Sequence, residues 1–140
     1  AAPASLDLLV LDAFSSDAVP MHLMTLEAFA TYARVLGDDG LLLVHISNRF
    51  LSLEPVVAAA AKAGGWHAAQ ITYHPTIMEE AEEAATSDWI ALSKSAGSIE
   101  RLKRDGGAWR ALEGKRDFTA WTDDYATILP VLRSLNEDLP

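Results

Sequence analysis

The sequence predicts one α/β domain, in which parallel strands alternate with helices and an antiparallel pair of strands closes one edge of the sheet. Three observations support this fold class. Two apolar runs, Leu6–Leu11 and 40–47, are typical of strands buried in a parallel sheet. A segment with helical periodicity separates them. Two more strand-like segments, 66–74 and 87–94, follow a second helix with only a glutamate-rich linker between them.

Length and composition bound the function. With 140 residues, 50% of them hydrophobic, the chain fits a single domain over residues 1–140. Its net charge of −9 disfavours nucleic acid and anionic membrane as partners. No apolar run approaches the roughly 18 residues of a membrane span, so no direct membrane contact is expected. The absence of cysteine excludes disulfides and thiolate chemistry, and we expect a cytoplasmic location.

The helices between the strands have recognisable ends. Thr25 is placed to cap a helix whose apolar residues lie at helical spacing and which Gly37 should end. A second helix is predicted from about residue 53 to residue 63, with Ser52 as its cap and Gly64 just after its end. The first strand, helix and next strand then form a βαβ unit with a right-handed crossover.

The C-terminal third is predicted to be helical in two places. The segment 98–116 holds six of the eleven basic residues and is interpreted as a surface helix, with Ser98 as a cap, followed by a turn. The last helix is predicted after "WTDDY", with Thr122 or Asp123 as its cap and Pro130 as a kink or a limit.

The N-terminal side of the predicted domain lacks features that such domains normally have. Nucleotide-binding α/β domains place a glycine-rich phosphate loop after their first strand, but the eight glycines here form no G-x-G-x-x-G. The strand Leu6–Leu11 lies almost at the N-terminus, where a buried strand normally has neighbours on both sides. The chain is therefore interpreted as the second half of a larger domain. As a sheet edge, this strand predicts self-association into a homo-oligomer.

A family resemblance rests on three segments in this order: "DLLVLDAFSSDAVPMHLMTLEAF", "GLLLVHISNRFLSLEPVV" and "WTDDYATILPVLR". Together they resemble the C-terminal half of the spermidine synthase-like family, including bacterial members fused to membrane transporter-like segments. The resemblance implies a partial Rossmann-like methyltransferase fold, in which the strand ending at Asp12 is the fourth. Spermidine synthases transfer an aminopropyl group from decarboxylated S-adenosylmethionine to putrescine.

A polar corner follows the first strand. Ligands of open α/β sheets bind beyond the carboxyl ends of the strands, so Asp12 and Asp17 are expected on the wall of a site. By resemblance to the family's D-S-S-D signature, Asp17 with Ser15 and Ser16 matches its last three positions, and Asp12 matches its leading acid. One catalytic carboxylate would accept the proton of the attacking amine and the other would hold the far ammonium. The two acids are five residues apart here and three apart in the family, and the alternative is that both bind loop amides or cap a helix.

Ser15 and Ser16 are candidates for substrate binding, and four more residues join them. His45 ends the second strand and is expected to face the same crevice, although a hydrogen-bonded core histidine is the alternative. The family also shares Asp123, Asp124 and Tyr125, for which a capped helix start is the alternative. The other histidines lack ligand spacing, so no metal is predicted. The four tryptophans are expected to pack in the core or in an interface.

Three functions therefore stay open. The first is an aminopropyl- or methyltransferase domain that lacks its cofactor-binding half and acts on a small amine such as putrescine. Its cofactor in the complete protein would be decarboxylated S-adenosylmethionine or S-adenosylmethionine, and none is expected for this chain alone. The second is a non-catalytic scaffold or regulatory remnant with a synthase-like fold. The third is a fragment with no activity of its own.

Overall fold

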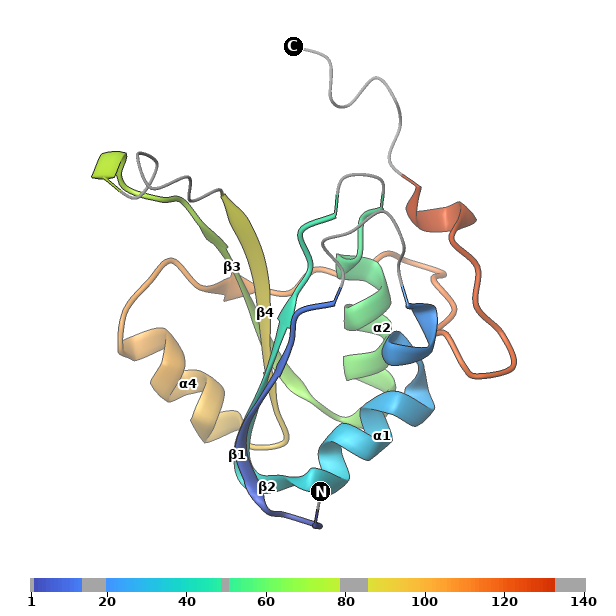
Figure 1. Ribbon diagram of the computed structural model, residues 1–140, viewed down its shortest axis with the longest axis horizontal. Helices are drawn as coiled ribbons and strands as arrows, with labels where there is room; N and C mark the ends of the chain where they lie inside the picture. The colour runs from blue at the N-terminus through green and yellow to red at the C-terminus, as the bar shows by residue number, and fades with distance from the viewer. Residues whose placement is uncertain (1, 14–19, 49–50, 79–85, 133–140) are drawn as a thin grey trace.

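The chain forms a five-stranded mixed sheet with helices on both faces (Figure 1). The computed structural model describes residues 2–13, 20–48, 51–78 and 86–132. The strand order across the sheet is β1-β2-β4-β3-β5. The strands are β1 (Leu6–Leu11), β2 (Leu36–His45), β3 (His67–Tyr73), β4 (Ser87–Ser93) and β5 (Arg110–Ala111). The helices are α1 (Leu26–Val35), α2 (Glu54–Gly64) and α4 (Ala96–Arg104), with short 3-10 helices at Met21–Met24 and Leu129–Val131.

Strand directions confirm the predicted fold class. β1 and β2 are parallel, with Leu11 opposite Val44. β4 is antiparallel to both of its neighbours, β2 and β3, so β3 runs in the same direction as β2. The fold is therefore a mixed α/β sheet that combines parallel strands and helices with an antiparallel pair, consistent with a partial Rossmann-like methyltransferase fold.

The core has two parts because successive side chains of a strand point to opposite faces of the sheet. On one face, α1 and α2 pack over Leu42 and Val44 of β2 and over Ile90 of β4. On the other face, Ile99 of α4 packs over Ala91 and its neighbours. β4 is covered on both faces, and its residues 90 to 93 are all buried.

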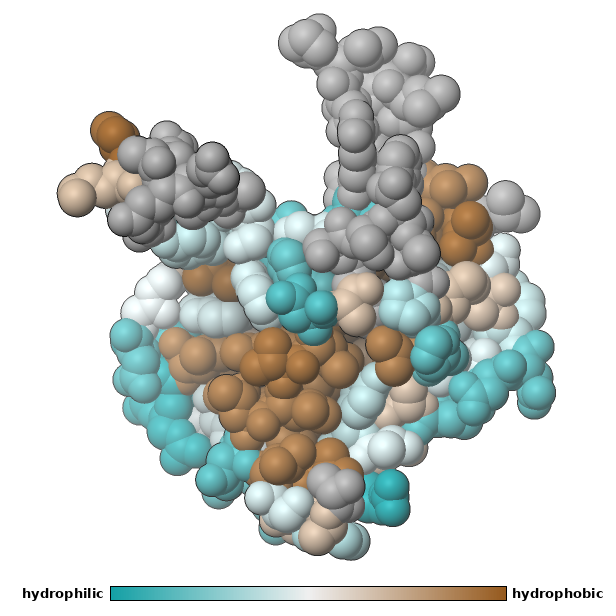
Figure 2. All heavy atoms as spheres, in the orientation of Figure 1, coloured by the Kyte–Doolittle hydropathy of each residue, from teal (hydrophilic) through white to brown (hydrophobic). Residues whose placement is uncertain are grey.

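β1 departs from the expectation that both of its faces are covered. It lies at the edge of the sheet, and α4 packs against β2, β3 and β4 instead. As a result the side chains of Leu8 and Val10 are 52% and 46% exposed. They lie beside Leu41 and Leu43 in the β1–β2 register, and Figure 2 shows an extended apolar patch on this side of the molecule.

The helix ends bear out some of the predicted caps and correct others. The Thr25 hydroxyl accepts a hydrogen bond from the amide of Ala28, as predicted for the cap of α1. Gly37 does not end that helix, because β2 already begins at Leu36. Ser52 does not cap α2 either, since its hydroxyl donates to the Glu54 side chain.

Two predictions for the C-terminal third are wrong. The cap of α4 is Ser95, while the Ser98 hydroxyl donates to the distant carbonyl of Asp39 at 2.9 Å. No helix begins at Thr122, which instead forms a tight turn with Tyr125. Most of the predicted glutamate-rich linker, residues 79–85, lies outside the described residues.

Candidate functional site

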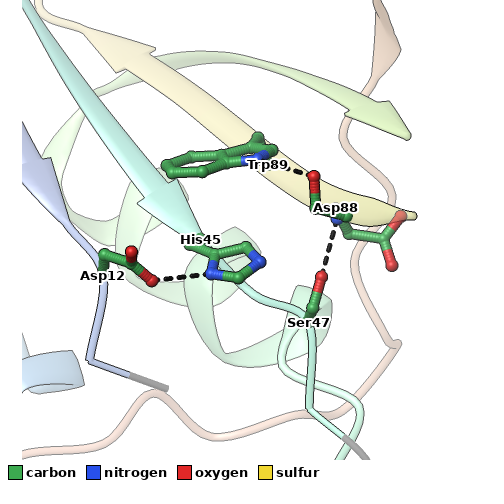
Figure 3. A network of polar contacts seen from close by, with 6 residues as sticks. Asp12, His45, Ser47, Asp88 and Trp89 are labelled. Atoms are coloured by element: carbon green, nitrogen blue, oxygen red, sulfur yellow. Dashed lines mark hydrogen bonds and ion pairs between the residues drawn. The ribbon is translucent and has the colours of Figure 1, made fainter. Parts of the chain in front are cut away.

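An acid and a histidine meet where two parallel strands end. Asp12 directly follows β1 and His45 is the last residue of β2. Since Leu11 pairs with Val44, the next residue of each strand is brought alongside the other. The His45 Nδ1 lies 2.7 Å from the Asp12 Oδ1 (Figure 3). The Asp12 side chain is 58% exposed and that of His45 is 14% exposed.

This contact defines the protonation pattern of the ring. A carboxylate can only accept hydrogen bonds, so Nδ1 of His45 carries the proton in its bond to Asp12. In a neutral ring the other nitrogen, Nε2, then has a free lone pair. Nε2 is buried and has no hydrogen-bond partner among the described residues. The pair is thus arranged as an oriented base that can take up one proton, with a carboxylate to stabilise the resulting charge.

Trp89 stacks against one face of the His45 ring. The β2–β4 register places Trp89 opposite His45, and the two rings stack with centroids 4.7 Å apart and planes inclined by 21° (Figure 3). The Trp89 Nε1 donates to the hydroxyl of Ser87 at 3.1 Å, which fixes the indole in turn. Sequence reasoning assigned the tryptophans to general packing, because the strand register that creates this stack has no signal in the sequence.

A second set of hydrogen bonds ties the segment after β2 to the start of β4. The amide of Asp88 donates to the Ser47 hydroxyl at 2.7 Å (Figure 3). The amide of Ile46 donates to the Asp88 carbonyl at 2.9 Å. The Asp88 carboxylate accepts from the hydroxyl of Thr72 at 2.6 Å. These bonds hold the backbone next to His45 in a fixed position.

The predicted site residues fall into three groups. Asp12 and His45 are together, as described above. Ser15, Ser16 and Asp17 lie in 14–19, outside the described residues. The third group is the turn that holds Asp123, Asp124 and Tyr125.

That turn lies at the start of α1. The Asp123 carboxylate accepts from the Thr25 hydroxyl at 2.9 Å, and the Asp123 amide donates to the Glu27 carboxylate at 2.8 Å. Asp124 and Tyr125 are exposed. No hydrogen bond or ion pair of the described residues connects this turn with Asp12 or His45. The turn borders a hollow of about 610 Å³ whose lining includes Thr25, Glu27 and Asp123 but neither member of the acid–histidine pair.

No cluster of three or more histidine and acidic side chains in the described ranges is arranged to hold a metal ion. None of the helices in the described part of the chain combines the length and the apolar character needed to cross a bilayer.

Comparisons with known proteins give a likeness of fold. No protein-family profile and no curated protein sequence matches the chain. Among solved structures, the chain is similar to a probable spermidine synthase from Corynebacterium glutamicum, with 16% sequence identity and a TM-score of 0.48. The match covers 85% of this chain and 50% of that protein, so the chain spans about half the length of the structure it matches.

Proposed function

We propose that this chain is the acceptor-side half of a spermidine synthase-like transferase, which moves an aminopropyl or methyl group to a small amine such as putrescine. In this proposal Asp12 and His45 remove the proton of the attacking amine. The observation that supports it is the 2.7 Å bond between the two side chains at the carboxyl ends of adjacent parallel strands. Ligands of open α/β sheets bind beyond those ends.

The chemistry of amine transfer matches this pair. An amine attacks through its nitrogen lone pair, so it must lose a proton before or during the transfer. The Nε2 of His45 accepts that proton, and Asp12 stabilises the positive imidazolium through Nδ1. A chain of net charge −9 also attracts a substrate that carries a second, charged amine. Asp17 is the residue proposed to hold that distant ammonium.

The group donor does not fit this chain. When bound, S-adenosylmethionine or its decarboxylated form supplies a carbon next to a sulfonium, and such cofactors usually lie against a glycine-rich turn after a strand. Among the described elements, no glycine lies between the end of a strand and an α-helix that follows it. We therefore assign only the acceptor side to these residues.

The alternative is a scaffold or regulatory remnant that keeps the fold without transferring a group. It is favoured by the burial of Nε2, because a buried nitrogen does not meet a substrate from solvent without a movement of its surroundings. The two functions differ in whether an amine reaches His45.

The experiment is a titration of the chain with putrescine, followed through the ¹⁵N signals of the His45 ring. We expect a saturable shift of these signals, and about tenfold weaker binding after Asp12→Ala, the loss expected for one charge-assisted hydrogen bond. The matched control is Asp7→Ala, which removes an exposed carboxylate from the same strand. Equal weakening in both variants would reduce the binding to general attraction by negative charge. Absence of any shift at His45 would favour the scaffold.

A further inference from the structure

A polar hollow lies on the sheet face opposite to the acid–histidine pair. Gln70 pairs with Ile90, so it faces α1 and α2, whereas His45 and Trp89 are the next pair along and point to the other face. The hollow has a volume of about 320 Å³, near the lower end of the range for small-molecule sites. It is lined by Ser52, Glu54, Pro55, Gln70, Arg110, Glu113 and Gly114.

Gln70 is a buried amide whose hydrogen-bonding capacity is mostly unused. Its side chain lines the hollow, and the residue is only 5% exposed. Its one side-chain hydrogen bond among the described residues runs from Nε2 to the Glu54 Oε1 at 3.5 Å, a long contact. An amide has two donor hydrogens and an acceptor oxygen, and buried polar groups are normally paired. The part of the Gln70 amide that has no protein partner is open to the hollow, where a polar ligand can bind it.

Opposite charges also line the hollow without neutralising one another. Both terminal nitrogens of Arg110 donate to the Thr72 hydroxyl at 3.4 Å, and no ion pair joins Arg110 to a carboxylate among the described residues. On the acidic side, the Glu54 Oε2 accepts from Ser52 at 2.9 Å, while Oε1 has only the long contact to Gln70. Glu113 is exposed and pairs with no described cation. One cation and two carboxylates therefore border the same space, and none of them forms an ion pair among the described residues.

We propose that this hollow binds a small zwitterion, a molecule that carries an ammonium and a carboxylate group, such as a free α-amino acid. The planar guanidinium of Arg110 suits a carboxylate, which it can bind through two parallel hydrogen bonds. The ammonium group lies toward Glu54 and Glu113. The Gln70 amide, which both donates and accepts, completes the floor. A ligand with both charges satisfies every one of these groups, and a simple cation or anion satisfies only one side.

The test is a titration of the chain with L-alanine, followed through the side-chain amide signals of Gln70. Acetate and methylammonium serve as the two half-ligands. We expect saturable shifts with L-alanine at a concentration at least about tenfold below that needed for either half-ligand, because each half forms only one of the two charge-assisted contacts. Equal binding of methylammonium would overturn the proposal in favour of a plain cation site. Equal binding of acetate, or no saturable shift, would overturn it as well.

Substituted variants distinguish binding of L-alanine in the hollow from a general effect of protein charge on binding. Arg110→Met should weaken L-alanine binding by about tenfold or more. The control is Arg104→Met, which removes the same charge from an exposed position in the last turn of α4. An equal loss in both variants would overturn the assignment. Gln70→Leu repeats the test with an apolar residue of similar size that suits a buried strand position, so the result does not depend on the folding of the Arg110 variant. Because this variant lacks the Gln70 amide, its titration is followed through the side-chain Nε–H signal of Arg110, which lines the same hollow.

Discussion

At the scale of single residues, Tyr32 shows what burial does to a titratable group. Tyr32 belongs to α1 and is buried in the hydrophobic core, where its hydroxyl donates to the carbonyl of Leu23 at 2.7 Å. Burial raises the pKa of Tyr32 from 10.0 to about 12, because the phenolate would lose its hydration. The folded chain therefore keeps a proton that the unfolded chain has already lost in this range of pH.

We expect the free energy of unfolding to fall as the pH rises from about 10 to about 12, since the unfolded state binds fewer protons there. A shift of this size corresponds to at most about 3 kcal/mol. Tyr32→Phe should remove this part of the pH dependence and cost about 1 kcal/mol at neutral pH for the lost hydrogen bond. Urea unfolding of both proteins between about pH 8 and 12 measures the difference. The same pH slope in both would contradict the assignment to Tyr32.

The candidate site also shows what single residues in a sequence can and cannot reveal. Asp12 and His45 were predicted as separate site residues, because each ends an apolar strand-like run. Their direct bond depends on the register of β1 against β2, and the stack with Trp89 depends on the register of β2 against β4. Register depends on how the buried faces of two strands fit against each other, so neither strand-like segment predicts it when taken alone.

At the scale of elements, the start of α1 is a junction between distant parts of the chain. The residue types in "TDDY" predict a helix cap, and the prediction was correct about the chemistry but wrong about the helix. Asp123 binds the cap residue of α1, Thr25, rather than starting a helix of its own. The same oxygen acceptors serve a local or a remote partner, and the sequence does not distinguish the two.

Thr25→Ala should destabilise the fold by about 1–2 kcal/mol, because it removes both the cap of α1 and the bond to Asp123. Thr25→Ser keeps the hydroxyl and should retain most of that stability. Asp123→Ala should cost less than Thr25→Ala, since it leaves the cap intact. The midpoints of urea unfolding give all three values. Equal stability of the alanine and serine variants at Thr25 would show that the hydroxyl contributes nothing.

At the scale of the whole molecule, the exposed apolar edge predicts self-association. Leu8 and Val10 are exposed on a strand whose outer edge pairs with no other strand of the described part of the chain. Water-exposed apolar strands of this kind pair readily with other strands. We expect the chain to form dimers or larger species as its concentration rises, as measured by light scattering after size-exclusion chromatography.

Val10→Lys should shift the chain toward the monomer, because a charge on the edge strand opposes pairing. The control is Ile77→Lys, which changes an apolar side chain that is also exposed but lies outside the sheet. A wild-type chain that stays monomeric at high concentration would contradict the prediction. So would an equal effect of the two lysine variants.

The order of helices and strands was predictable over most of the chain, because apolar periodicity and helix-ending glycines are local signals. The position of β4 in the sheet could not be predicted. β3 and β4 follow one another and were expected to pair, but only the structure shows that β4 enters between β3 and β2. That choice is decided by the burial of both faces of β4, which requires α2 and α4 to be in place at once.

The inserted position of β4 has a consequence for the way the chain folds. β1, α1 and β2 form one local unit, and β3 with β4 forms another, each from segments close together in the chain. Among the described residues, the two units pair through one seam, from Leu42–Leu92 to His45–Trp89, which must close a long loop. We therefore expect β2 to remain an edge strand during synthesis until β4 has left the ribosome. The stack of Trp89 on His45 therefore requires that the two units have joined along this seam.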